Sequence, residues 1–159
     1  MTRTYARAPR GERAVVTEPV EYGASISVLS ALALRGVLAP MTIAGAVNAE
    51  VFDLYVARVL APALRPGDIV LLDNVRFHYS ERAVRLIHGA KASVEYLPAY
   101  SPDFDPIEGC IAKLKAILRT LKARTQRKLG QALKYAIEQV TLDDVRGWFR
   151  HCGYTYSLN

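Results

Sequence analysis

The sequence predicts a single-domain α/β fold, and three features support that prediction. Two apolar runs, 26–34 and 37–45, flank the short connection Arg35-Gly36, which is typical of a β-hairpin. A continuous apolar run at 69–72 is followed by a helical pattern and by a second strand-like run at 92–97, the order of a βαβ unit. Amphipathic helical patterns occupy the remaining third of the chain.

Length and composition agree with this class. The chain has 159 residues, 51% of them apolar and 23% charged, which fits one globular domain and excludes a disordered chain. No apolar stretch approaches the roughly 20 residues that cross a bilayer, so we expect no membrane partner and a cytoplasmic location. Cys110 and Cys152 have no second cysteine at metal-ligand spacing, so we expect reduced thiols rather than a disulfide or zinc framework.

The first half of the chain is read in order. Residues 1–24 are rich in Arg, Pro and Gly and predict a loop with at most one short strand around "AVV". After the hairpin, the apolar period between Asn48 and Pro62 predicts a packed helix that Asn48 caps. The turn 65–68 leads into "IVLL", a run typical of a strand in the middle of a parallel sheet.

The βαβ unit follows. Ser80 is predicted to cap a helix that continues to about His88, with Gly89 as its terminator, and "ASVEYL" returns as a strand. A right-handed crossover makes the two strands parallel. It places Asp73 at the carboxyl end of its strand, where open α/β sheets bind ligands.

Three helices are predicted in the last part of the chain. The Pro-rich loop "LPAYSPDFDPIEGC" leads into a helix whose apolar residues keep a 3.6 period from Ile107 to Leu121. Two more helices are expected near 126–139 and 142–150, and Thr141 with Asp144 three residues later predicts a capping box for the second.

Asp73 and Glu108 are the candidate functional acids, with 34 residues between them. Each has a structural alternative. Asp73 could accept hydrogen bonds from the turn after its strand, and Glu108 could complete an acidic capping box with Asp105 as N-cap and Pro106 at the first helical position. Against this, the helix start brings Glu108 within reach of a neighbouring strand end. Two converging carboxylates repel unless a cation neutralises them, which predicts a shared Mg²⁺ site.

The net charge of +6 is concentrated in one stretch. No acid occurs between Gly109 and Ile137, and eight basic residues do: Lys113, Lys115, Arg119, Lys122, Arg124, Arg127, Lys128 and Lys134. Such a cluster attracts polyanions, and phosphate contacts supply most of the sequence-independent affinity for nucleic acid. A solvated helix face is the alternative interpretation.

Two segments, "LLDNVRFHYS" and "YLPAYSPDFDPIEGCIAKLKAILR", resemble the catalytic domain of the DDE transposases, specifically the mariner-like group and its bacterial insertion-sequence relatives. The resemblance depends on the spacing of the two acids and on the tract L-P-x-Y-S-P-x-x-x-P-I-E, and it continues through "RAPRGERAVV" and "WFRHCGY". It implies a ribonuclease-H-like fold, in which helices flank a mixed sheet with hairpin strands first and a parallel part after.

The resemblance also implies an activity. Asp73 and Glu108 would bind two Mg²⁺ or Mn²⁺ ions for cleavage at transposon ends and strand transfer into target DNA. Asn74 and His78 match the motif and are expected to shape the site, although a lone histidine is more often structural. The expected contacts to DNA phosphates come from Lys113, Lys115, Arg119, Lys122, Arg124, Arg127 and Lys128. Full-length relatives are expected to be homo-oligomers.

The chain departs from the family pattern at its start. The first catalytic aspartate of the family lies on the first sheet strand, upstream of the segment that resembles "RTYARAPRGER", and a helix-turn-helix domain precedes it. We therefore expect residues 1–159 to be one N-terminally incomplete catalytic domain. It would lack the strand between the hairpin and the Asp73 strand, and this loss would expose apolar edges and unpaired backbone groups. Asp105, where relatives often have Asn, is a smaller departure.

Two functional interpretations remain. In the first, the chain is part of an enzyme, binds metal weakly and cleaves little or no DNA alone, because an upstream transposase fragment supplies the missing aspartate. In the second, it is a non-catalytic remnant that acts as a DNA-binding module. A different ribonuclease-H-like nuclease, such as a resolvase, agrees less well with the Pro-rich tract before Glu108.

Overall fold

The computed structural model describes residues 9–11, 25–123 and 125–155. The elements in chain order are β1 (Ile26–Ala33), β2 (Gly36–Ala44), α1 (Ala49–Tyr55), the π-helical segment η1 (Val56–Leu60), α2 (Ala61–Ala63), β3 (Ile69–Leu72), the 3₁₀ turn η2 (Arg76–Tyr79), α3 (Glu81–Gly89), β4 (Ser93–Tyr96), the 3₁₀ turn η3 (Pro102–Phe104), α4 (Ile107–Leu121), α5 (Gln126–Glu138) and α6 (Leu142–His151). The strand considered around "AVV" lies outside the described residues.

The predicted hairpin is confirmed. β1 and β2 pair antiparallel, with Ile26 opposite Ala44 and Ala33 opposite Gly36. Gly36 has φ +118°, a backbone conformation that L side chains rarely adopt, so glycine suits the position that opens β2. The guanidinium of Arg35, in the turn, donates to the Asp68 carboxylate at 2.7 Å and so fixes the hairpin to the loop before β3.

The predicted helix after the hairpin forms, and it extends slightly beyond Pro62. The Asn48 side chain accepts a hydrogen bond from the Val51 N–H at 2.9 Å, as expected of an N-cap. The helix widens to a π turn just before Pro62, where the N–H of Ala61 donates to Val56 O. Because Pro62 has no N–H to donate, the regular ladder cannot pass through it unchanged.

The βαβ unit is parallel as predicted, with Ile69 of β3 opposite Ser93 of β4. Ser80 caps α3, and the helix ends at Gly89, within one residue of the predicted end, but Gly89 has no positive φ and so is not a left-handed cap. The left-handed residue is Lys91, with φ +61°, and its carbonyl accepts a hydrogen bond from the Gly67 N–H at 2.8 Å. The left-handed turn therefore lies two residues after Gly89, and this bond ties it to the loop before β3.

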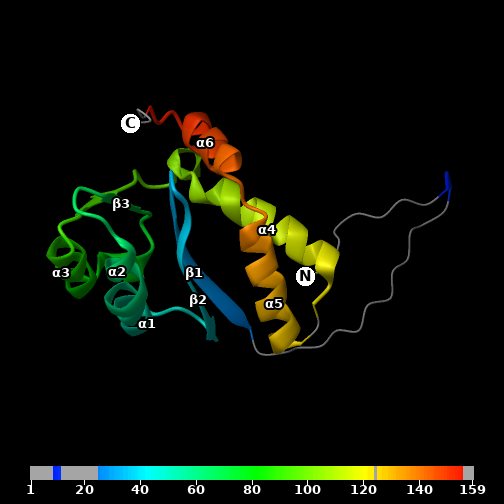
Figure 1. Cartoon of the computed structure of the whole chain (residues 1–159), viewed down its shortest axis with the longest axis horizontal. Coiled ribbons are helices and arrows are strands. Elements are labelled where there is room, and N and C mark those ends of the chain that lie inside the picture. Colours follow the sequence, from blue (N-terminus) through cyan, green and yellow to red (C-terminus); the bar gives the residue numbers. More distant parts are fainter. Residues whose placement is uncertain (1–8, 12–24, 124, 156–159) are drawn as a thin grey trace.

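The α/β class with helices around mixed strand pairings is confirmed. Within the described residues the strands form two separate two-stranded sheets, antiparallel β1–β2 and parallel β3–β4, with no strand between them. Figure 1 shows the hairpin standing between the unit that contains α1 to α3 and the helices α4 to α6. No helix in the described part of the chain is both long and apolar enough to cross a membrane.

Two apolar cores lie on the two sides of the hairpin. The first consists of Phe52, Tyr55, Val56, Leu60, Leu72, Ala83, Ile87 and Ala92. The second is centred on Cys110, Leu114 and Ala136 of the later helices. Ala31 of β1 packs against the first core and its neighbour Leu32 against the second, because successive side chains of a strand point to opposite faces.

The strand β3 is buried on one face only. Val70 packs on the first core and Leu72 is part of it, while Ile69 is 63% exposed and Leu71 is 37% exposed. The prediction from "IVLL" of a strand in the middle of a sheet, covered on both faces, is therefore wrong for the described residues.

Candidate active site

Asp73 directly follows β3, and its two carboxylate oxygens have different surroundings. Oδ1 accepts a hydrogen bond from the Val75 N–H at 3.1 Å and lies 2.7 Å from Nδ1 of His78. Oδ2 has no hydrogen-bond partner among the described residues, and the side chain is 49% exposed. The turn contact that the structural alternative predicted is present, yet one oxygen stays open to a ligand.

His78 is fixed beside Asp73 by aromatic packing. Its ring centroid lies 4.7 Å from that of Phe52 and 4.6 Å from that of Phe77, which meets it edge-on. The hydroxyl of Tyr96 on β4 donates to the His78 carbonyl at 3.0 Å. His78 therefore holds one Asp73 oxygen in place, which is a positioning role.

Asn74 connects the ends of β3 and β4. Its Nδ2 donates to Leu97 O at 2.5 Å, and its Oδ1 accepts a hydrogen bond from the hydroxyl of Tyr79. The Tyr79 ring stacks on Tyr96 with centroids 4.8 Å apart. Because both ends of the amide have protein partners, Asn74 is placed to hold the loop after β3 rather than to bind a ligand.

Glu108 lies in the first turn of α4, and its carboxylate takes no hydrogen bond from any described residue. The Asp105 carboxylate accepts from the Ile107 N–H at 3.2 Å, but no bond returns from the Glu108 side chain to Asp105. The capping-box interpretation of Glu108 is therefore wrong, whereas the predicted box at Thr141 and Asp144 does form. The carboxylate of Glu108 remains open.

The carboxyl of Asp105 is influenced by the charges of both candidate acids. Burial raises the pKa of its carboxyl, and the negative charges of Glu108 and Asp73 raise it further, while His78 lowers it. All three side chains therefore lie within electrostatic range of Asp105. The sequence predicted for Asp105 a role as a helix cap and showed it as a departure from the family pattern, but indicated no role beside the two acids. Its position three residues before Glu108 was the one feature of the sequence that could have indicated its proximity to the candidate acids.

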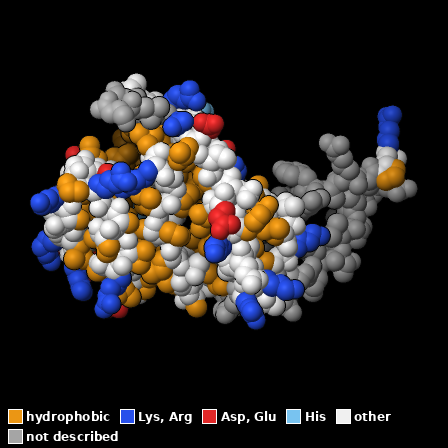
Figure 2. All heavy atoms as spheres, viewed as in Figure 1, with side chains coloured by type: hydrophobic (Ala, Val, Ile, Leu, Met, Phe, Trp, Pro, Cys, Tyr) orange, Lys and Arg blue, Asp and Glu red, His pale blue; other side chains and the backbone are white. Residues whose placement is uncertain are grey.

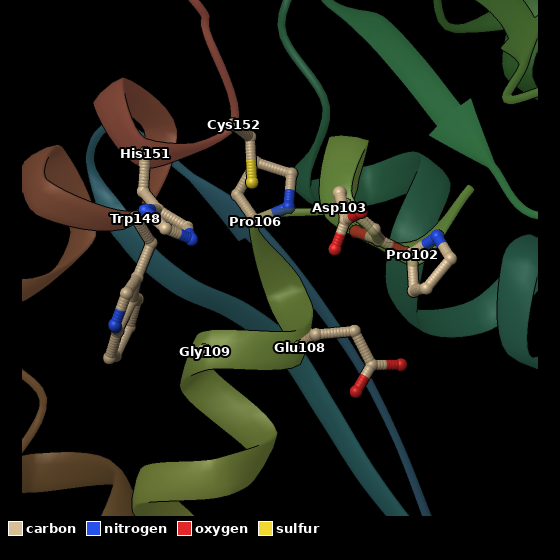
Figure 3. A pocket seen from close by; sticks show the side chains of 9 residues that line it. Pro102, Asp103, Pro106, Glu108, Gly109, Trp148, His151 and Cys152 are labelled. Atoms are coloured by element: carbon tan, nitrogen blue, oxygen red, sulfur yellow. The ribbon is translucent and has the colours of Figure 1, made fainter.

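A cavity of about 310 Å³ adjoins Glu108. Figure 3 shows the loop before α4 on one side and α6 on the other. The residues that line it are Pro102, Asp103, Asp105, Pro106, Glu108, Gly109, Trp148, His151 and Cys152. Asp73 is not among them, so the cavity is not a cleft between the two acids.

The donor chemistry fits a hard divalent cation only in part. Open carboxylate oxygens such as those of Asp73 and Glu108 are ligands that Mg²⁺ prefers. In the part of the chain that the structure describes, however, no group of three or more His, Cys, Asp or Glu side chains is placed to hold a metal ion. The described residues therefore supply only some of the ligands that a bound metal ion would need.

The basic stretch divides into paired and unpaired residues. Lys113 contacts the Asp144 carboxylate at 2.5 Å and so joins α4 to α6. Six others are exposed and form no ion pair with described residues: Lys115, Arg119, Lys122, Arg127, Lys128 and Lys134. Arg124 lies outside the described residues. Figure 2 shows Lys and Arg side chains over α5 and the end of α4.

A family model described as "DDE superfamily endonuclease" matches residues 1–130. The chain belongs to this DDE endonuclease family. The match contains Asp73, Glu108 and most of the basic stretch, and it ends within α5, so α6 lies beyond it. The resemblance to DDE transposases that the sequence suggested is confirmed.

Solved structures show the same fold. The DDE chain is similar to a chain in the crystal structure of the Mos1 strand transfer complex, with a TM-score of 0.73 and 18% sequence identity. The similarity covers 96% of this chain and 46% of that one, so the chain spans about half the length of the solved relative. None of the curated proteins matches this DDE chain.

Proposed function

We propose that this chain is a transposase catalytic domain that takes part in metal-dependent DNA strand cleavage and strand transfer. The observation that carries the proposal is that Asp73 and Glu108, which come from distant segments of the family domain, both keep carboxylate oxygens that take no hydrogen bond from described residues. Membership of the DDE endonuclease family supports the same reaction class.

In this proposal Asp73 and Glu108 bind two Mg²⁺ or Mn²⁺ ions. Such ions would supply Lewis acidity for the attacking and leaving oxygens of an in-line displacement. His78 and the Asn74 loop hold the Asp73 carboxylate in one orientation. A further carboxylate is needed to complete the ligand set, and an upstream transposase fragment is the proposed source. We therefore expect weak metal binding and little cleavage by this chain alone.

DNA is the proposed partner, both as transposon end and as target. The exposed cations Lys115, Arg119, Lys122, Arg127 and Lys128 would contact phosphates and give salt-dependent affinity. Lys113 is left out of this set because its ammonium is committed to Asp144. The full-length protein is expected to act in the cytoplasm as a homo-oligomer.

A non-catalytic DNA-binding module is the second candidate. It is favoured by one observation, namely that the described residues contain no complete group of metal ligands. This function needs only the fold and the exposed cations. It predicts DNA binding that is independent of Mn²⁺ and of both acids.

Metal titration separates the two candidates. Calorimetry with Mn²⁺ is expected to detect a weak site that Asp73→Ala and Glu108→Gln each remove. Asp143→Asn is the control, because Asp143 is a 91% exposed acid on α6. Nicking of supercoiled DNA with Mn²⁺, alone and with the upstream fragment added, then tests catalysis. Mn²⁺ affinity that is the same in all three variants would exclude the metal site, and retained DNA binding would then support the module.

A further inference from the structure

The helix α6 contacts α4 and runs antiparallel to it beside its first turns (Figure 1). Asp144 contacts Lys113 at 2.5 Å, one turn after Glu108. At the other end, the Tyr154 hydroxyl donates to the Phe104 carbonyl at 2.8 Å, just before α4. Glu108 therefore lies between two attachment points of the same C-terminal segment.

The middle contact is between Trp148 and Gly109. A Cβ atom at residue 109 would lie 2.5 Å from Cδ1 and 2.7 Å from Cγ of the Trp148 ring, closer than real Cβ atoms approach. Glycine is therefore required for the ring to lie against the α4 backbone. Figure 3 shows Trp148 and Glu108 on either side of Gly109. The ring thus packs on the residue that directly follows Glu108.

The Trp148–Gly109 contact can be removed without detaching α6 from α4. Val145 is fully buried on α6, and Trp148 is only partly buried where it packs beside Cys110 and Leu114. α6 can thus stay attached through Val145 and the Asp144–Lys113 pair if Trp148 is shortened. The family match, which ends at residue 130, assigns no role to this helix.

We propose that Trp148 is a positioning residue for Glu108. The flat ring lies on Gly109 and fixes the rotation of the first turn of α4, which sets the direction in which the Glu108 carboxylate points. This inference rests on the proposed metal role of Glu108. It makes α6 a part of the active site although none of its residues is expected to touch the metal.

The test compares two truncations on the same helix. Trp148→Ala is expected to weaken Mn²⁺ binding by about 10–100-fold, the usual cost of losing a residue that orients a ligand. The matched control Val145→Ala removes a fully buried side chain from α6, so it lowers the thermal midpoint but leaves Mn²⁺ affinity unchanged. An equal loss of affinity in both variants, or no loss in Trp148→Ala, would overturn the proposal.

Gly109→Ala provides the reciprocal test. It is expected to weaken Mn²⁺ binding because the new methyl group displaces the ring. Adding Trp148→Ala removes this overlap, so the double variant should lose less affinity than the two single losses combined. Strictly additive losses would count against a direct contact effect.

A second measurement tests the role of Trp148 even if the wild-type protein binds no Mn²⁺. The proposed metal function then fails, while the positioning inference is still tested by hydrogen exchange in the first turn of α4. Trp148→Ala is expected to speed exchange there more than Val145→Ala does. Equal exchange in the two variants would refute the inference independently of metal.

Discussion

The two oxygens of the Asp73 carboxylate differ in how they are held. One oxygen is held by the Val75 N–H and by His78, and the other is open. A carboxylate with one fixed oxygen has a defined direction for the second, which lowers the entropy lost when an ion binds. The aromatic packing around His78 therefore contributes to the site without reaching it.

Replacing His78 tests this arrangement. His78→Ala is expected to reduce Mn²⁺ affinity by about 10–100-fold, because residues that orient a metal ligand typically contribute that much. Calorimetric titration measures the change. His88→Ala, at an exposed histidine on α3, is the control and should bind Mn²⁺ like the wild type. If the two variants behave alike, Asp73 does not depend on His78.

Asp144 gives a pH dependence with a defined sign. The Lys113 ammonium, followed by the Thr141 N–H, lowers the pKa of this carboxyl from 3.8 to about 2. Folding therefore favours the ionised form, so this stabilisation is present above pH 3.8 and is lost as the pH falls towards about 2. Urea midpoints measured across this window should fall less steeply in Asp144→Asn than in the wild type. Parallel curves would contradict the ion pair.

At the scale of elements, the sequence predicts helix caps correctly where the cap depends only on residues adjacent in the chain. Asn48, Ser80 and Thr141 each cap the predicted helix, because a cap depends on the two or three residues that follow it. The left-handed cap at Gly89 and the Glu108 box did not form. The left-handed residue after α3 is Lys91, whose carbonyl accepts from the Gly67 N–H, and the Glu108 side chain makes no hydrogen bond to Asp105.

The basic face of α4 allows a paired test of DNA binding. Lys115→Ala is expected to reduce the slope of log affinity against log salt concentration by about 0.9, the contribution of one phosphate contact. Lys113→Ala should leave this slope unchanged, because Lys113 is paired with Asp144. Fluorescence anisotropy with duplex DNA at several salt concentrations measures both. An equal change in both variants would place Lys113 at the DNA.

At the scale of the whole molecule, the hairpin joins two cores and leaves one face of β3 open. This arrangement predicts that substitutions at different positions of β3 lower the free energy of unfolding by different amounts. Leu72→Ala, in the first core, is expected to lower the free energy of unfolding by about 2–5 kcal/mol. Ile69→Thr, at a 63% exposed position, should change it by less than about 0.5 kcal/mol.

Urea denaturation of both variants tests this prediction. Equal destabilisation would show that another segment or a second chain covers Ile69 in solution. Sequence periodicity could not reveal the open face, because a run of four apolar residues looks the same whether a strand is covered on one side or on two.

The sequence by itself determined the order and type of the main helices and strands and the family, and it named Asp73 and Glu108 as candidate acids. These follow from patterns within a few residues and from a motif of fixed spacing. Only the tertiary structure decided that Lys113 is paired with Asp144 and that Trp148 packs on Gly109. These contacts join residues that are up to 39 positions apart, and packing of whole helices, rather than local backbone preference, brings such residues together.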